Sequence, residues 1–69
     1  MSATISITLN GTPRQTAAPD LATLVRELNL EPERVVAEHN GTIVPAEDFA
    51  RVALAEGDVL ELLRFVGGG

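Results

Sequence analysis

Two Asn-Gly dipeptides, at residues 10–11 and 40–41, constrain the fold more than any other feature of the sequence. Asn-Gly between two strand-like segments is a strong hairpin signal, because both residues tolerate the positive φ angles of a type I′ turn. The segment TISITL, residues 4–9, alternates isoleucine or leucine with small polar residues, as a half-buried strand does. We therefore expect a hairpin at the start of the chain and a second one around residues 40–41.

The return strand of the first hairpin, residues 12–17, contains Pro13. Proline has no amide hydrogen to donate to a neighbouring strand, so this strand is expected at the edge of a sheet. The second Asn-Gly predicts a strand at residues 35–40 and a short strand at residues 42–44, which Pro45 ends.

Between the hairpins, the segment PDLATLVRELNL (residues 19–30) changes to a helical period. Asp20 is a favourable N-cap residue. The apolar residues that follow it at i, i+3, i+4 and i+7 form one stripe: Leu21, Leu24, Val25 and Leu28. Proline disfavours helical geometry in the residue before it, so the helix is expected to end at Glu31-Pro32.

The last third of the chain is less regular. Residues 46–54 are compatible with one helical turn that contains Phe49 and Val52, and a turn at residues 55–58 precedes a final strand at residues 59–65. This order of elements predicts an α+β roll, with a mixed sheet of four to five strands and one main helix packed across one face. The helical crossover permits a parallel pair between the first and last strands.

The length of 69 residues predicts one domain, which we place at residues 1–65, followed by a flexible glycine tail at residues 66–69. Ten acidic residues against five basic ones give a net charge of −5, which makes nucleic acid an unfavourable partner. The sequence contains no cysteine, no apolar stretch long enough to span a membrane and no signal peptide, so a cytoplasmic protein without membrane contact is expected.

No catalytic or metal-binding constellation emerges from the residue types. His39 is the single histidine, and its neighbour Glu38 points to the opposite face of a strand, so a structural or surface role is expected for His39. No metal and no bound cofactor are predicted, and the chain is not expected to be an enzyme. The glycines at its end have no Cβ atoms and can pass through a narrow channel of another protein.

The order of elements, the motif NGTIVP at residues 40–45, EGD at residues 56–58 and the ending GDVLELLRFVGGG together resemble the ThiS family. Members of this family are ubiquitin-like sulfur carriers of thiamine thiazole biosynthesis. The resemblance covers essentially the whole chain and implies the β-grasp fold, in agreement with the roll expected from the elements.

The resemblance also implies a chemical role for the last residues. The terminal carboxylate of Gly69, preceded by Gly68, would be adenylated with ATP by an E1-like partner of the ThiF type and then converted to a thiocarboxylate. The sulfur would come from cysteine through a cysteine desulfurase, and a thiazole synthase of the ThiG type would accept it.

The side chains of the final strand are expected to alternate between the core and the outside. An unpaired buried carboxylate is costly, so Glu61 is expected to face outward, together with Leu63 and Phe65. These apolar residues are either covered by a helix or loop, or exposed as part of a partner-binding patch. We expect the second, with the patch continuing into Val66 and Gly67.

Other functions remain open at this stage. A molybdopterin-type carrier, or another small ubiquitin-like sulfur carrier, would share the terminal chemistry. A non-catalytic binding module of the TGS type would use the same fold without it, and a protein-conjugation modifier would attach its terminus to lysine.

Overall fold

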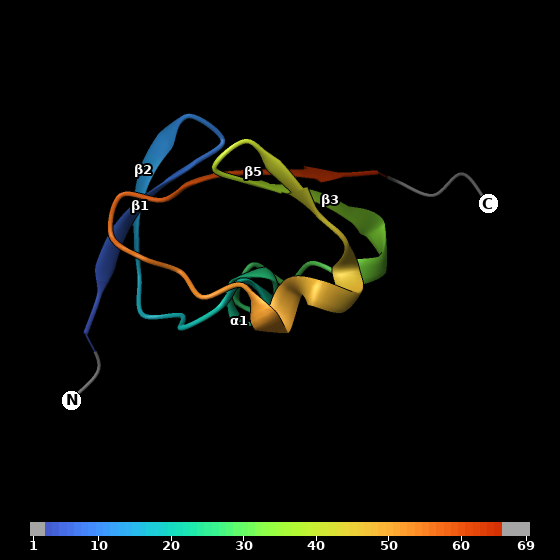
Figure 1. The fold of residues 1–69 in the computed structure, drawn as a ribbon, viewed down its shortest axis with the longest axis horizontal. Helices are drawn as coiled ribbons and strands as arrows, with labels where there is room; N and C mark the ends of the chain where they lie inside the picture. The colour runs from blue at the N-terminus through green and yellow to red at the C-terminus, as the bar shows by residue number, and fades with distance from the viewer. Residues whose placement is uncertain (1–2, 66–69) are drawn as a thin grey trace.

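The computed structural model describes residues 3–65, which form a five-stranded sheet with a helix across one face (Figure 1). The elements are β1 (Ile5–Leu9), β2 (Thr12–Thr16), α1 (Leu21–Glu27), the 3-10 helix η1 (Pro32–Arg34), β3 (Val35–His39), β4 (Thr42–Val44), the 3-10 helix η2 (Ala46–Arg51) and β5 (Val59–Arg64). The strand order is β2-β1-β5-β3-β4. Strands β1 and β5 are parallel and the other neighbours are antiparallel, so the predicted mixed α+β sheet and its parallel pair are confirmed.

Both Asn-Gly turns form as predicted. Asn10 and Gly11 have φ angles of 51° and 79°, and Asn40 and Gly41 have φ angles of 52° and 87°. These positive values are those that a type I′ turn requires at its two central residues. Strand β2, which contains Pro13, lies at one edge of the sheet, as the missing amide hydrogen demands.

The helix begins as predicted but ends earlier. The Asp20 side chain accepts a hydrogen bond from the Thr23 N–H at 2.8 Å and caps the first turn. The predicted end at Glu31-Pro32 is wrong, because α1 ends at Glu27 and Asn29 adopts a φ of 60°.

The helix ends there because its last carbonyl groups are already paired. The Leu30 N–H donates to the Val25 carbonyl at 3.1 Å and the Asn29 N–H donates to the Arg26 carbonyl at 3.0 Å, the two bonds of a Schellman motif. Pro32 is instead the first residue of η1. An N–H group at this position has no hydrogen-bond partner within a helix, so proline is tolerated there.

The core lies between the sheet and the layer made by α1 and η2. Its buried apolar residues are Ile7, Ala18, Leu21, Leu24, Val25, Val35, Ala37, Val44, Phe49, Leu60 and Leu62. The ambiguous segment after β4 is the 3-10 helix η2, which places Phe49 in this core at 1% exposure. Within the described part of the chain, no helix is long and apolar enough to cross a membrane.

Candidate functional site

Strand β5 leads to the residues predicted to carry the chemistry, and its end is fixed in place. It pairs with β1 on one side at Val59 and Leu60, and with β3 on the other side from Leu60 to Arg64. The Phe65 N–H donates to the Arg34 carbonyl at 3.1 Å, which extends the pairing one residue past the strand. The predicted site residues Val66, Gly67, Gly68 and Gly69 follow directly and lie outside the described residues.

The two turn asparagines also hold β5 through their side chains. Asn10 Oδ1 accepts from the Leu62 N–H at 2.8 Å, and Asn10 Nδ2 donates to the Leu62 carbonyl at 3.2 Å. Asn40 Oδ1 accepts from the Val59 N–H at 2.8 Å. Each of these side-chain amides thus forms hydrogen bonds with the β5 backbone, as the backbone of a neighbouring strand would. The Asn-Gly turn signal in the sequence does not reveal this role.

The face of the sheet opposite α1 is exposed and partly apolar. We call it the outer face and define it by Val36, Glu38, Ile43, Val59, Glu61 and Leu63. Leu63 is 68% exposed and Phe65, just beyond the strand, is 50% exposed. The prediction that these two side chains face outward is confirmed, and coverage by a helix or loop is wrong, because α1 and η2 both pack on the other face (Figure 1).

Two carboxylates face each other on the outer face. In the pairing of β3 with β5, Glu38 lies opposite Glu61, and Val36 lies opposite Leu63 in the neighbouring row. These four side chains surround a small hollow of about 40 Å³. Neither glutamate forms an ion pair with any residue of the 3–65 segment.

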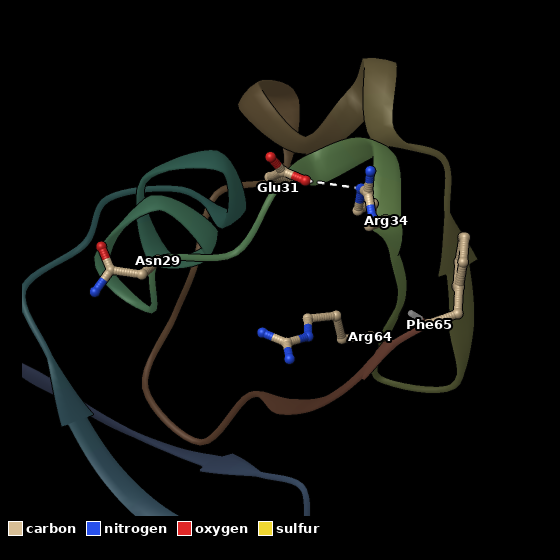
Figure 2. A pocket seen from close by; sticks show the side chains of 5 residues that line it. All are labelled: Asn29, Glu31, Arg34, Arg64 and Phe65. Atoms are coloured by element: carbon tan, nitrogen blue, oxygen red, sulfur yellow. Dashed lines mark ion pairs between the residues drawn. The ribbon is translucent and has the colours of Figure 1, made fainter. Parts of the chain in front are cut away.

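A larger pocket of about 270 Å³ lies at the end of β5, lined by Asn29, Glu31, Arg34, Arg64 and Phe65 (Figure 2). Arg34 Nε donates to Glu31 Oε1 at 2.8 Å, but both side chains are more than half exposed, so this ion pair stabilises the fold little. Figure 2 shows the Arg64 side chain directed toward Asn29, away from the Phe65 ring. The pocket is therefore lined both by polar residues near the end of α1 and by Phe65, the exposed apolar residue just beyond the strand.

Sequence reasoning missed one polar cluster, which joins the end of β3 to the loop before β5. His39 Nε2 lies 2.8 Å from Asp58 Oδ2, which also accepts from the Ala55 N–H at 2.9 Å, while Asn40 Nδ2 donates to Asp58 Oδ1 at 3.1 Å. Burial alone would raise the pKa of Asp58, but these three hydrogen bonds together hold it below its ordinary value of 3.8.

This cluster has a structural role, consistent with the structural or surface role expected for His39. The two partners are 19 residues apart in sequence, so no local spacing indicated the contact. Among residues 3–65, no three histidine, aspartate or glutamate side chains are grouped closely enough to hold a metal ion. The described residues thus present an exposed, partly apolar sheet face and a strand end held by backbone pairing.

Comparison with known proteins places this geometry in a family. The model of the ThiS family matches residues 7–69. The sulfur carrier protein ThiS of Bacillus subtilis is 39% identical over 46 residues, which cover 67% of this chain and 70% of that protein. The crystal structure of the thiamine biosynthesis protein ThiS from Geobacter metallireducens superposes with a TM-score of 0.77 at 32% identity, covering 94% of this chain and 100% of that one. This match confirms the predicted β-grasp roll.

A second kind of relative is much longer. A thiazole synthase of Paramagnetospirillum magneticum is 36% identical over 66 residues, which cover 94% of this chain and 20% of that protein. A thiazole synthase of Magnetococcus marinus matches with the same identity and coverage. The chain therefore spans about a fifth of the length of these two relatives.

Proposed function

The chain belongs to the ThiS family of sulfur carriers of thiamine biosynthesis, and from this membership we propose that the carboxylate of Gly69 is the group that carries the sulfur. Carriers of this type are not catalysts, so partner enzymes perform the reactions at this group. An adenylating enzyme of the ThiF type uses ATP to join AMP to the Gly69 carboxylate and releases pyrophosphate. The carrier itself binds no cofactor.

The adenylate makes the acyl carbon of Gly69 electrophilic. A persulfide, formed when a desulfurase takes sulfur from cysteine, attacks this carbon through its terminal sulfur and displaces AMP, which gives an acyl disulfide. A thiol then attacks the other sulfur of this S–S bond, so that a new disulfide forms and the terminal sulfur stays on Gly69 as a thiocarboxylate. A thiazole synthase of the ThiG type then takes this sulfur. Two relatives named thiazole synthase contain a stretch that is 36% identical to this chain, which supports a partner of that type.

The observation that carries the proposal is the fixed end of β5 immediately before the glycines. Backbone pairing holds the chain in place up to Phe65, the last described residue before this segment. Four residues, from Val66 to Gly69, reach roughly 13 Å when extended. Gly67, Gly68 and Gly69 carry no side chain that would clash in a narrow active-site channel.

In the same proposal, the residues around the strand end bind the partner enzymes. Leu63 and Phe65 are exposed apolar side chains, and large aromatic or aliphatic residues of this kind anchor protein interfaces. Val66 and Gly67 follow them and extend the contact toward the reactive end.

The proposal is tested by the mass of the protein after incubation with the ThiF-type enzyme, ATP and a sulfur source. We expect the mass to rise by the difference between one sulfur and one oxygen atom. A variant that lacks Gly69 is the matched control, because it keeps every core residue and should show no such change. An unchanged mass for the intact chain, with an enzyme shown to be active on its own carrier, would contradict the proposal.

A further inference from the structure

The outer face carries a feature that the fold does not explain. Glu38 and Glu61 are directly opposite each other across β3 and β5, and like charges in this position disfavour a strand pair. The side chains around them are apolar, with Val36 and Leu63 in the neighbouring row and Ile43 opposite Glu38 on β4. The free domain therefore bears an unfavourable carboxylate pair in the middle of an exposed apolar surface.

No cation of the described residues neutralises this pair. The five arginines of the chain are Arg14, Arg26, Arg34, Arg51 and Arg64. Arg26, Arg34 and Arg51 belong to the helical elements α1, η1 and η2. Arg14 lies opposite the buried Ile7, and Arg64 is in phase with the buried Leu60 and Leu62, so both belong to the helix side of the sheet.

We propose that Glu38 and Glu61 together receive one arginine of the ThiF-type adenylating enzyme, and that Val36, Ile43 and Leu63 pack around it. The planar guanidinium group presents several donors in a fixed geometry, which suits two neighbouring carboxylates. The aliphatic stem of the arginine can lie on the apolar side chains beside them. This inference rests on the proposed function, because the enzyme that holds the glycine end must cover the strand that leads into it.

A second copy of this chain is a poorer occupant of the outer face. A two-fold contact between identical faces would bring four glutamates together in a protein that already carries a net charge of −5. A basic partner surface, by contrast, is attracted to the acidic domain before contact and relieves the repulsion between the two carboxylates after it.

The test uses the full chain and the purified ThiF-type enzyme of the same organism. The variants are Glu38→Gln, Glu61→Gln and their combination. The control combines Glu33→Gln on η1 with Glu47→Gln on η2, which gives the same charge change as the double variant. The dissociation constant is measured by titration calorimetry at low and high salt. We expect the Glu38→Gln/Glu61→Gln variant to bind roughly tenfold more weakly at low salt and to lose most of the salt dependence, whereas the Glu33→Gln/Glu47→Gln control changes binding less than about twofold.

A further variant, Leu63→Ala, separates charge from apolar packing. It should weaken binding but keep the salt dependence, because the carboxylates remain. The thermal midpoint of Glu38→Gln and of Glu61→Gln should equal or exceed that of the wild type, since each removes a like-charge contact. A lower midpoint would show that the pair stabilises the free fold and would overturn the inference.

Binding is measured by calorimetry and sulfur loading by mass, so that the arginine-binding proposal and the sulfur-carrier proposal can fail independently. If the Glu38→Gln/Glu61→Gln variant binds like the wild type at both salt concentrations, the arginine-binding role is overturned, while normal loading of the wild type leaves the sulfur-carrier proposal intact. If binding depends on the glutamates but the mass never changes, the docking inference holds and the carrier chemistry fails. Self-association of the wild type that the glutamine variants abolish would assign the face to a second copy and overturn the inference.

Discussion

At the scale of single residues, asparagine has two different roles in this chain. Asn10, Asn29 and Asn40 all adopt positive φ angles, which asparagine tolerates better than most residues. Asn10 and Asn40 also bond the backbone of β5 through their side chains, whereas no side-chain hydrogen bond is formed by Asn29 among the described residues. The sequence predicts the two Asn-Gly turns but not this difference.

Replacing Asn10 by glycine separates the turn from the side-chain bonds. Glycine accepts the positive φ at this position, but the two hydrogen bonds to Leu62 are lost. We expect the free energy of unfolding, measured in urea, to fall by about 1–3 kcal/mol. Asn29→Gly is the matched control, because glycine is preferred at the residue after a helix and no such bonds are lost there. Equal losses in both variants would show that chain flexibility, and not the side-chain bonds, sets the stability.

Asp58 makes the stability of the domain depend on pH in the acidic range. Its hydrogen bonds outweigh the effect of burial and lower the pKa of the carboxyl in the folded state, so the ionised form stabilises the fold. This stabilisation is complete above the ordinary value of 3.8 and is lost as the pH falls through the lower pKa of the folded state. We expect Asp58→Asn to lower the free energy of unfolding by about 1–3 kcal/mol at pH 7 and to flatten its decline in acid.

The Asp58→Asn variant should keep part of the decline of stability in acid, because the ionised form of Asp20 also stabilises the fold. The backbone hydrogen bond from Thr23, supported by the side-chain bond, lowers the pKa of Asp20 below its ordinary value. Urea denaturation of the wild type and Asp58→Asn between neutral pH and pH 3 measures the difference. Parallel curves for the two proteins would contradict a role for Asp58 in the acid dependence.

At the scale of elements, the sequence predicted where strands and helix begin better than where they end. Asp20 marked the start of α1 because a capping side chain acts on its own neighbours. The end was misplaced because Pro32 is a conspicuous breaker, whereas Asn29 stops the helix through backbone bonds that only its left-handed conformation permits. The inward phase of Leu60 and Leu62 was predictable from alternation and the cost of burying Glu61.

The contacts between elements were the part that the sequence could not supply. The opposition of Glu38 and Glu61 depends on the register of β3 against β5, which local patterns do not determine. The bond between His39 and Asp58 likewise requires the sheet to bring two distant segments together. The exposed phase of Leu63 and Phe65 was predicted, but the carboxylate pair that gives their surface a charge preference was not.

At the scale of the whole molecule, packing and chemistry occupy different parts of the chain. Among residues 3–65, every buried apolar residue lies between Ile7 and Leu62, and the outer face is built entirely on the sheet. The proposed reactive group, at Gly69, comes after Leu62, the last buried apolar residue in the described part of the chain. Folding and docking should therefore be separable from sulfur loading.

A chain that ends at Phe65 tests this separation. It keeps every buried apolar residue of the 3–65 segment, both turns and the outer face, so its free energy of unfolding should lie within about 0.5 kcal/mol of the wild type. It should also compete with the full chain for the ThiF-type enzyme and slow the loading of the full chain, without gaining sulfur itself. The same truncated chain with Leu63→Ala is the matched control and should compete less well, because it lacks an exposed apolar contact. A truncated chain that folds normally but does not compete at any concentration would show that the enzyme recognises the glycine end alone and would exclude docking through the sheet.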